Sequence, residues 1–133
     1  MAVFDSREDA DGAIEALTGA GIDRSRIELY EGPADADAFD ASGRRRGLRG
    51  RIYRIIEFTW ADQAPDFAYY EAAMREGRRV LSVRVRGQEE VRRVADLVAK
   101  AGGHFINHFG WFESQEISRW RGKEPDLPVF LRR

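Results

Sequence analysis

Two stretches of the chain, residues 2–32 and 78–112, show the same succession of hydrophobic patterns, and this repetition restricts the possible folds more than any other feature. In each stretch, a short apolar or alternating run is followed by apolar residues at helical spacing and then by a second short run. We therefore expect the order strand, helix, strand twice. That order predicts an α+β, ferredoxin-like sandwich, in which one layer of helices covers a four-stranded antiparallel sheet.

The two helices are marked by apolar stripes that recur every three or four residues. Ser6, followed three residues later by Asp9, resembles a capping box, in which a side chain accepts a hydrogen bond from a free backbone N–H group. The residues expected to face the core are Ala10, Ala13, Ile14 and Leu17 in the first helix and Val91, Val94, Ala95 and Val98 in the second. A pair of glycines follows each stripe, where helices commonly end.

The residues between and after the two units have a different composition. Residues from about 32 to 50 are rich in Ala, Asp and Gly without a sustained period, which predicts a mobile loop. Residues from about 51 to 77 show helical spacing, so we expect an inserted helical segment. Its later apolar face consists of Phe67, Tyr70 and Met74. From about 113 to 133, Ser114 suits the cap of a short helix, and two prolines then favour an extended arm. We expect one domain over residues 1–133.

Alternation along the strands predicts a polar face on the sheet. If the aliphatic set covers the helices, the opposite face carries Ser82, Ile106 and six ligand-binding candidates: Glu28, Tyr30, Arg84, Arg86, His104 and His108. The arginines offer donors to an anion, the tyrosine offers a stacking surface, and a histidine can give or take a proton. Such a face is either solvated or buried in a dimer, with Arg84 paired to Glu28, or it forms a cleft for a small anionic or aromatic ligand. We favour the first of these.

The two histidines are not expected to form a metal site. On a strand, at roughly 3.3 Å per residue, the Cα atoms of His104 and His108 lie about 13 Å apart, too far for both rings to bind one ion. The chain also has no cysteine, which removes thiolate ligands and thiol nucleophiles. We expect no metal and no cofactor, assign no catalytic residue, and favour a protein that is not an enzyme.

The charge and hydropathy of the chain argue against nucleic-acid and membrane partners. Its 22 basic and 23 acidic residues lack the basic excess of chains that bind nucleic acid or anionic lipid. Residues 44–54 do contain six arginines and no acid, which suits phosphate, but this run also balances the acidic residues before it. No apolar run approaches the roughly 18 residues of a membrane span, and the N-terminus does not resemble a signal peptide. We expect a cytoplasmic protein.

Aromatic residues near the C-terminus suggest contact with a second copy. The interface candidates are Trp111, Phe112, Trp120 and Phe130. Aromatic side chains often anchor interfaces, and the apolar arm either packs on its own domain or grips another chain. We expect a homo-oligomer, most simply a dimer.

Three stretches resemble a known family. They are "VFDSREDADGAIEALTGAGIDRSRIEL" (residues 3–29), "YYEAAMREGRRVLSVRV" (69–85) and "AGGHFIN" (101–107). Over roughly residues 2–110, the chain resembles the YflT-like general stress protein domain of the heat-induced stress protein family. The resemblance implies a bacterial, stress-associated cytoplasmic protein and carries over no catalytic residues.

Taken together, these features predict a non-enzymatic, stress-associated binding or interaction module that self-associates. Two alternatives stay open. One is a small enzyme or sensor that binds an anionic or aromatic small molecule over the sheet face. The other is a protein that binds nucleic acid through its arginine-rich loop.

Overall fold

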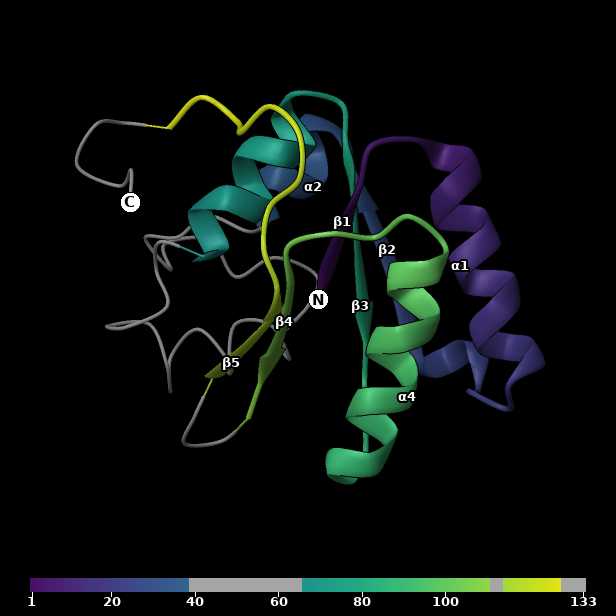
Figure 1. Cartoon of the computed structure of the whole chain (residues 1–133). Coiled ribbons are helices and arrows are strands. Elements are labelled where there is room, and N and C mark those ends of the chain that lie inside the picture. The colour runs from purple at the N-terminus through teal and green to yellow at the C-terminus, as the bar shows by residue number, and fades with distance from the viewer. Residues whose placement is uncertain (39–65, 111–113, 128–133) are drawn as a thin grey trace.

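The structure is a computed structural model, and it describes residues 1–38, 66–110 and 114–127. Along the chain, its helices and strands are β1 (Ala2–Phe4), α1 (Arg7–Gly19), a turn of 3-10 helix (Arg24–Arg26), β2 (Ile27–Glu31), α2 (Gly32–Ala38), a helix at residues 66–75, β3 (Arg79–Val83), α4 (Gly87–Lys100), β4 (Ile106–Phe109) and β5 (Ser114–Ser118) (Figure 1). The expected α+β class is confirmed. Within these ranges, no helix combines the length and the apolar character needed to cross a membrane.

The described strands form two antiparallel sheets rather than the single four-stranded sheet expected from the sequence. One sheet has the strand order β1-β3-β2, and the other pairs β4 with β5. A β-bridge between Val3 and His104 links them, with N···O distances of 2.8 and 2.9 Å. The strand is interrupted directly after this bridge, because Phe105 adopts a left-handed backbone conformation with a φ of 48°.

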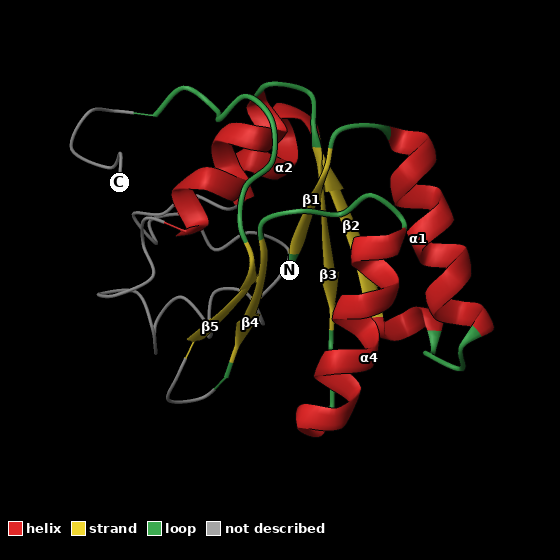
Figure 2. Ribbon diagram, in the orientation of Figure 1, coloured by secondary structure: helices red, strands yellow, loops and turns green. Residues whose placement is uncertain are grey.

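Helices α1 and α4 cover one face of the three-stranded sheet (Figure 2). The backbone N–H of Asp9 donates to the Ser6 hydroxyl at 3.1 Å, which confirms the predicted cap of α1. Phe4, Ile27 and Leu81 from the sheet are buried against the helices. The buried residues of the two predicted stripes are Ala10, Ala13, Leu17, Val91, Val94, Ala95 and Val98.

The opposite face of this sheet is also covered, so the expected single layer of helices was wrong. Helix 66–75 and α2 lie on that side (Figure 2). The predicted apolar face of helix 66–75, which consists of Phe67, Tyr70 and Met74, is buried there. Two residues of the sheet, Tyr30 and Val80, are buried with it. Tyr30, at 1% exposure, is therefore a core residue and not part of an open polar face. Alternation along a strand shows that its two faces differ, but it does not show that only one of them is covered.

Two local expectations were also wrong. Helix α2 occupies the start of the expected loop, because Pro33 suits a first helical turn and the Asp35 carboxylate accepts a hydrogen bond from the backbone N–H of Glu31 at 2.9 Å. Strand β5 replaces the short helix expected from Ser114, because this segment satisfies its backbone by pairing with β4. The rest of the expected loop and most of the inserted segment, residues 39–65, lie outside the described residues.

Candidate functional site

A slot of about 190 Å³ lies between the two sheets. Met1 borders it, and Figure 1 shows the N-terminus between β3 and β4. On the side of β2 and β3, the slot is lined by Arg26, Glu28, Tyr30, Leu81, Ser82, Val83, Arg84 and Val85. The other side consists of Ile106, Asn107, His108, Phe109 and Ile117, and α4 contributes Val91, Val94, Ala95 and Val98. The α4 surface of the slot is thus apolar, and its β2–β3 wall carries charged side chains.

The slot lies where β3 and β4 extend past β1. The first residue of β1 lies opposite Leu81, whereas β3 continues to Val83. On the other side, Met1 and Asn107 exchange two main-chain hydrogen bonds, of 2.7 and 2.9 Å, and β4 continues to Phe109. Beyond Met1, no described strand lies between β3 and β4.

The structure brings together four of the six ligand-binding residues predicted from the sequence. Glu28, Tyr30, Arg84 and His108 all line the slot. Arg86 does not, but it lines a neighbouring hollow of about 220 Å³ that also contains Arg84. The sixth residue, His104, lies in a different environment. The predicted polar face thus corresponds in part to the slot, although Tyr30 reaches it from the core.

The polar side chains of the slot differ in the contacts that they already make. The Tyr30 hydroxyl donates to the Glu28 carboxylate. Arg26 donates through Nε to the backbone oxygen of Arg84 at 2.9 Å, and its Nη2 lies 2.8 Å from a Glu90 oxygen. The hydrogen bond from Arg26 holds the pKa of the Glu90 carboxyl below its usual value. Arg84 is exposed, and its guanidinium has no hydrogen bond or ion pair with any described residue. Arg84 is therefore available to bind an anion.

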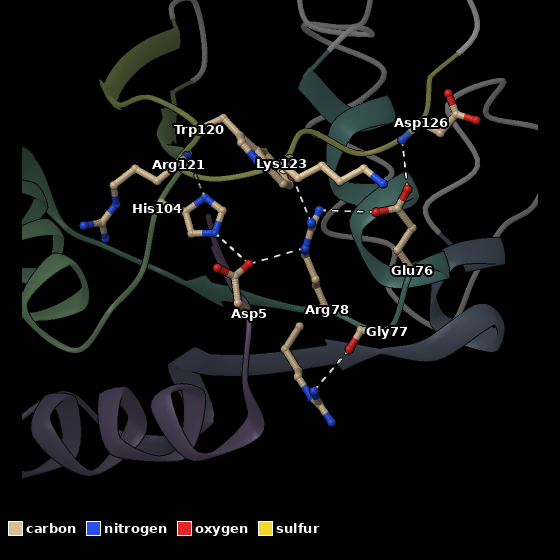
Figure 3. A network of polar contacts seen from close by, with 10 residues as sticks. Asp5, Glu76, Gly77, Arg78, His104, Trp120, Arg121, Lys123 and Asp126 are labelled. Atoms are coloured by element: carbon tan, nitrogen blue, oxygen red, sulfur yellow. Dashed lines mark hydrogen bonds and ion pairs between the residues drawn. The ribbon is translucent and has the colours of Figure 1, made fainter.

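His104 belongs to a separate polar network, shown in Figure 3. Its side chain is almost fully buried, its Nδ1 accepts from the backbone N–H of Arg121 at 3.2 Å, and its Nε2 lies 3.0 Å from Oδ1 of Asp5. Because Nδ1 is an acceptor, the proton of the neutral ring is on Nε2, which donates to Asp5. The prediction that His104 and His108 share one sheet face was wrong, because the left-handed Phe105 between them breaks the alternation.

Arg78 and Trp120 extend the network around His104. Arg78 Nε lies 3.3 Å from Oδ1 of Asp5, and the guanidinium stacks 5.0 Å from the centroid of the Trp120 ring. Trp120 also contacts Phe105, with ring centroids 5.6 Å apart. This predicted interface residue thus packs within its own chain. The other three interface candidates, Trp111, Phe112 and Phe130, lie outside the described residues, as do the six arginines of residues 44–54.

Asn107 is a buried structural amide at the edge of the slot. The side chain is 3% exposed, and its Nδ2 donates to the Tyr70 hydroxyl at 2.9 Å. That hydroxyl donates in turn to the backbone oxygen of Phe105 at 2.9 Å. Burial raises the pKa of Tyr70, which keeps the hydroxyl neutral. These contacts fix β4 against helix 66–75 and so position the wall of the slot.

Sequence reasoning missed several slot residues. Arg26 precedes β2, and no pattern distinguishes it from the other arginines. Val91 and Val94 were expected as core, and they are buried, but they also border the slot. Within the described ranges, no group of three or more His, Cys, Asp or Glu residues is arranged to hold a metal ion.

No protein-family model matches the chain, and neither does any curated protein or solved structure. The resemblance to the YflT-like general stress protein domain stays a prediction. A functional proposal for this chain therefore rests on the slot and on the residues that line it.

Proposed function

We propose that the protein is a non-enzymatic binding module whose slot takes a ligand with an acidic group and an apolar part. The observation that carries this proposal is the position of Arg84. Arg84 is exposed, and its guanidinium makes no hydrogen bond or ion pair with a described residue. It borders a slot that the α4 valines also line. A guanidinium binds carboxylate or phosphate through forked hydrogen bonds, and an apolar wall binds the remainder of such a molecule.

The slot encloses only a small ligand or part of a longer one. Sites for drug-sized molecules usually measure about 300–1,000 Å³, and this slot measures about 190 Å³.

The proposal also includes the stress-associated role in a bacterial cytoplasm that the resemblance implies. It further includes a ferredoxin-like arrangement of the strands. The hydrogen bonds from Val3 to His104 and from Met1 to Asn107 support a ferredoxin-like strand order of β4-β1-β3-β2.

A titration followed by NMR tests the binding site. Isovalerate combines a carboxylate with a branched apolar chain, and isopentylamine is a matched cationic control. We expect isovalerate, but not the amine, to shift the methyl signals of Val91 and Val94, and we expect Arg84→Ala to weaken this binding at least fivefold. Arg92→Ala is the control variant, because Arg92 is exposed on α4 but does not line the slot. Equal shifts with both compounds, or none with either, would contradict the proposal.

A second candidate role is self-association, supported by one observation on β5. This strand pairs with β4 on one side, and Ile117 on it is the only large hydrophobic side chain among the described residues that is exposed, at 38%. An edge strand with an apolar side chain is a template for pairing with another chain. We propose that a second copy of this chain occupies that edge.

A further inference from the structure

The main-chain groups along the slot point to a specific class of ligand. We infer that the slot accepts an extended peptide as an additional strand between β3 and β4, with an acidic residue flanked by two apolar residues. This inference rests on the proposed function, because it uses the same slot and the same arginine. It goes further in stating that the ligand is recognised through its backbone.

The main chain of β3 directs alternate residues toward the slot. The backbone N–H of Arg84 donates to the backbone oxygen of Arg26, on the β2 side, at 2.9 Å. Successive residues of an antiparallel strand direct their N–H and C=O groups to opposite sides. The main-chain groups of Val83 therefore point away from β2 and toward the slot.

The main chain of β4 also directs alternate residues toward the slot. Asn107 exchanges two main-chain hydrogen bonds with Met1, so its N–H and C=O groups face β1. Two residues further along an extended strand, the same groups of Phe109 face the same side. Among the described residues, neither Val83 nor Phe109 has a main-chain hydrogen-bond partner on that side.

Among the described residues, no strand occupies this position between β3 and β4. Val83 and Phe109 offer backbone donors and acceptors to it from opposite walls, and Met1 closes one end. A strand placed there lies in line with β1, and β1 is antiparallel to β3 and to the His104 segment. Unpaired main-chain groups beside a strand position are the feature that β-strand addition uses to bind peptides.

The register predicts the side chains of such a peptide. In β1, Ala2 and Phe4 face the α1–α4 core, whereas Val3 faces the other core. Continuing this alternation past Met1 places the peptide residue opposite Val83 toward the α4 valines, so it should be apolar. The peptide residue opposite Arg84 lies on the same face as that arginine and should be acidic.

The side chain at the third position of the peptide is predicted from the same alternation. The peptide residue opposite Val85 returns to the side of α4 and should again be apolar. The predicted sequence is thus apolar, acidic, apolar, and acetyl-Val-Glu-Val-amide is its simplest example. A small free carboxylate shares the contact with Arg84 but offers no main chain to Val83 and Phe109.

Calorimetric titration with three peptides tests this inference. They are acetyl-Val-Glu-Val-amide, its Lys counterpart, and a depsipeptide in which an ester oxygen replaces the Glu N–H. We expect the ester and the Lys peptide each to bind at least fivefold more weakly than the parent. Arg84→Ala should abolish the preference for Glu over Lys and leave the preference for amide over ester. Amide exchange at Val83 and Phe109 should slow at least tenfold when the parent peptide binds.

The outcomes separate the two proposals. Equal binding of amide and ester, or unchanged exchange at Val83 and Phe109, would overturn the inference of strand addition. If isovalerate binds the slot and the peptides do not, the proposed function stands and the peptide inference is wrong. If neither binds, both are wrong.

Discussion

The Nε2 atom of His104 lies 3.0 Å from Oδ1 of Asp5, although 99 positions separate the two residues. The contact joins the end of β1 to the segment before β4, next to the β-bridge at Val3. Because Nδ1 of the same ring accepts from the backbone of Arg121, one buried side chain links β1, β4 and the segment after β5.

Removing the Asp5 carboxylate, which accepts from His104, should loosen the segment after β5. We expect Asp5→Ala to lower the free energy of unfolding by about 1–2 kcal/mol, since the buried ring loses its partner. Amide exchange at Arg121 should become faster. Asp11→Ala is the control, because the Arg7–Asp11 pair is exposed, with atoms 3.8 Å apart, and should contribute less than about 0.5 kcal/mol. Equal effects of the two variants in urea unfolding would show that the His104 contact does not stabilise the fold.

Gly103 is predicted to tolerate no side chain. A Cβ atom there would lie 2.6 Å from Cγ1 of Val98 and 3.0 Å from Cζ of Phe4. We expect Gly103→Ala to destabilise the fold by about 1–3 kcal/mol through overpacking. Gly12 is the matched control, because it is exposed in α1 and a Cβ there meets nothing within 4 Å. Gly12→Ala should stabilise by about 1 kcal/mol. Thermal unfolding measures both changes, and a loss of stability at both positions would refute the packing argument.

The α-amine of Met1 should make stability depend on pH. Burial lowers its pKa from 8.0 to about 5, so the folded state binds fewer protons than the unfolded state between these values. Stability should therefore fall as the pH decreases from 8 to 5 and should not change further from this group below pH 5. Urea midpoints over this range test the effect, with intact mass confirming that Met1 is present.

Acetylation supplies the control for the Met1 effect. An acetylated amine keeps one N–H for the Asn107 carbonyl but carries no charge. Its urea midpoints should vary less between pH 8 and pH 5 than those of the free amine. An identical pH dependence of the two forms would mean that the amine does not titrate in this range.

Ile117→Lys tests self-association. If a second copy pairs along β5, a charge in place of the exposed isoleucine should raise the dimer dissociation constant at least tenfold, measured by sedimentation over a dilution series. Glu15→Gln, on the exposed surface of α1, makes the same change in net charge and should have no effect. A wild-type chain that stays monomeric at all concentrations, or equal dissociation constants for the two variants, would refute this role.

The sequence predicted the parts of the fold that depend on local spacing. The stripe from Ala10 to Leu17 and the cap at Ser6 depend on residues within two or three turns of one another, and both are present as expected. The side of the sheet that holds Tyr30 was interpreted wrongly. Its environment is set by helix 66–75, which lies far away in the sequence and packs on it only in the folded chain.

The slot itself was only partly predictable. Alternation placed Glu28 and Arg84 on one face, and both line the slot. No local pattern indicated the left-handed Phe105, since residues other than glycine rarely adopt this conformation. Because Phe105 breaks the alternation of side chains along the strand, His104 and His108 lie in different environments. The alignment of β1 with β3, which places Ala2 opposite Leu81, depends on the register between strands, and register is a property of tertiary structure.

Hydrogen exchange of the ligand-free protein shows whether the strand position between β3 and β4 is open. We expect the amides of Val83 and Phe109 to exchange at least a hundredfold faster than those of Ser82 and His108, which lie in the same strands but face paired neighbours. Equal protection of all four amides would mean that this position is already filled, and it would rule out strand addition at the slot.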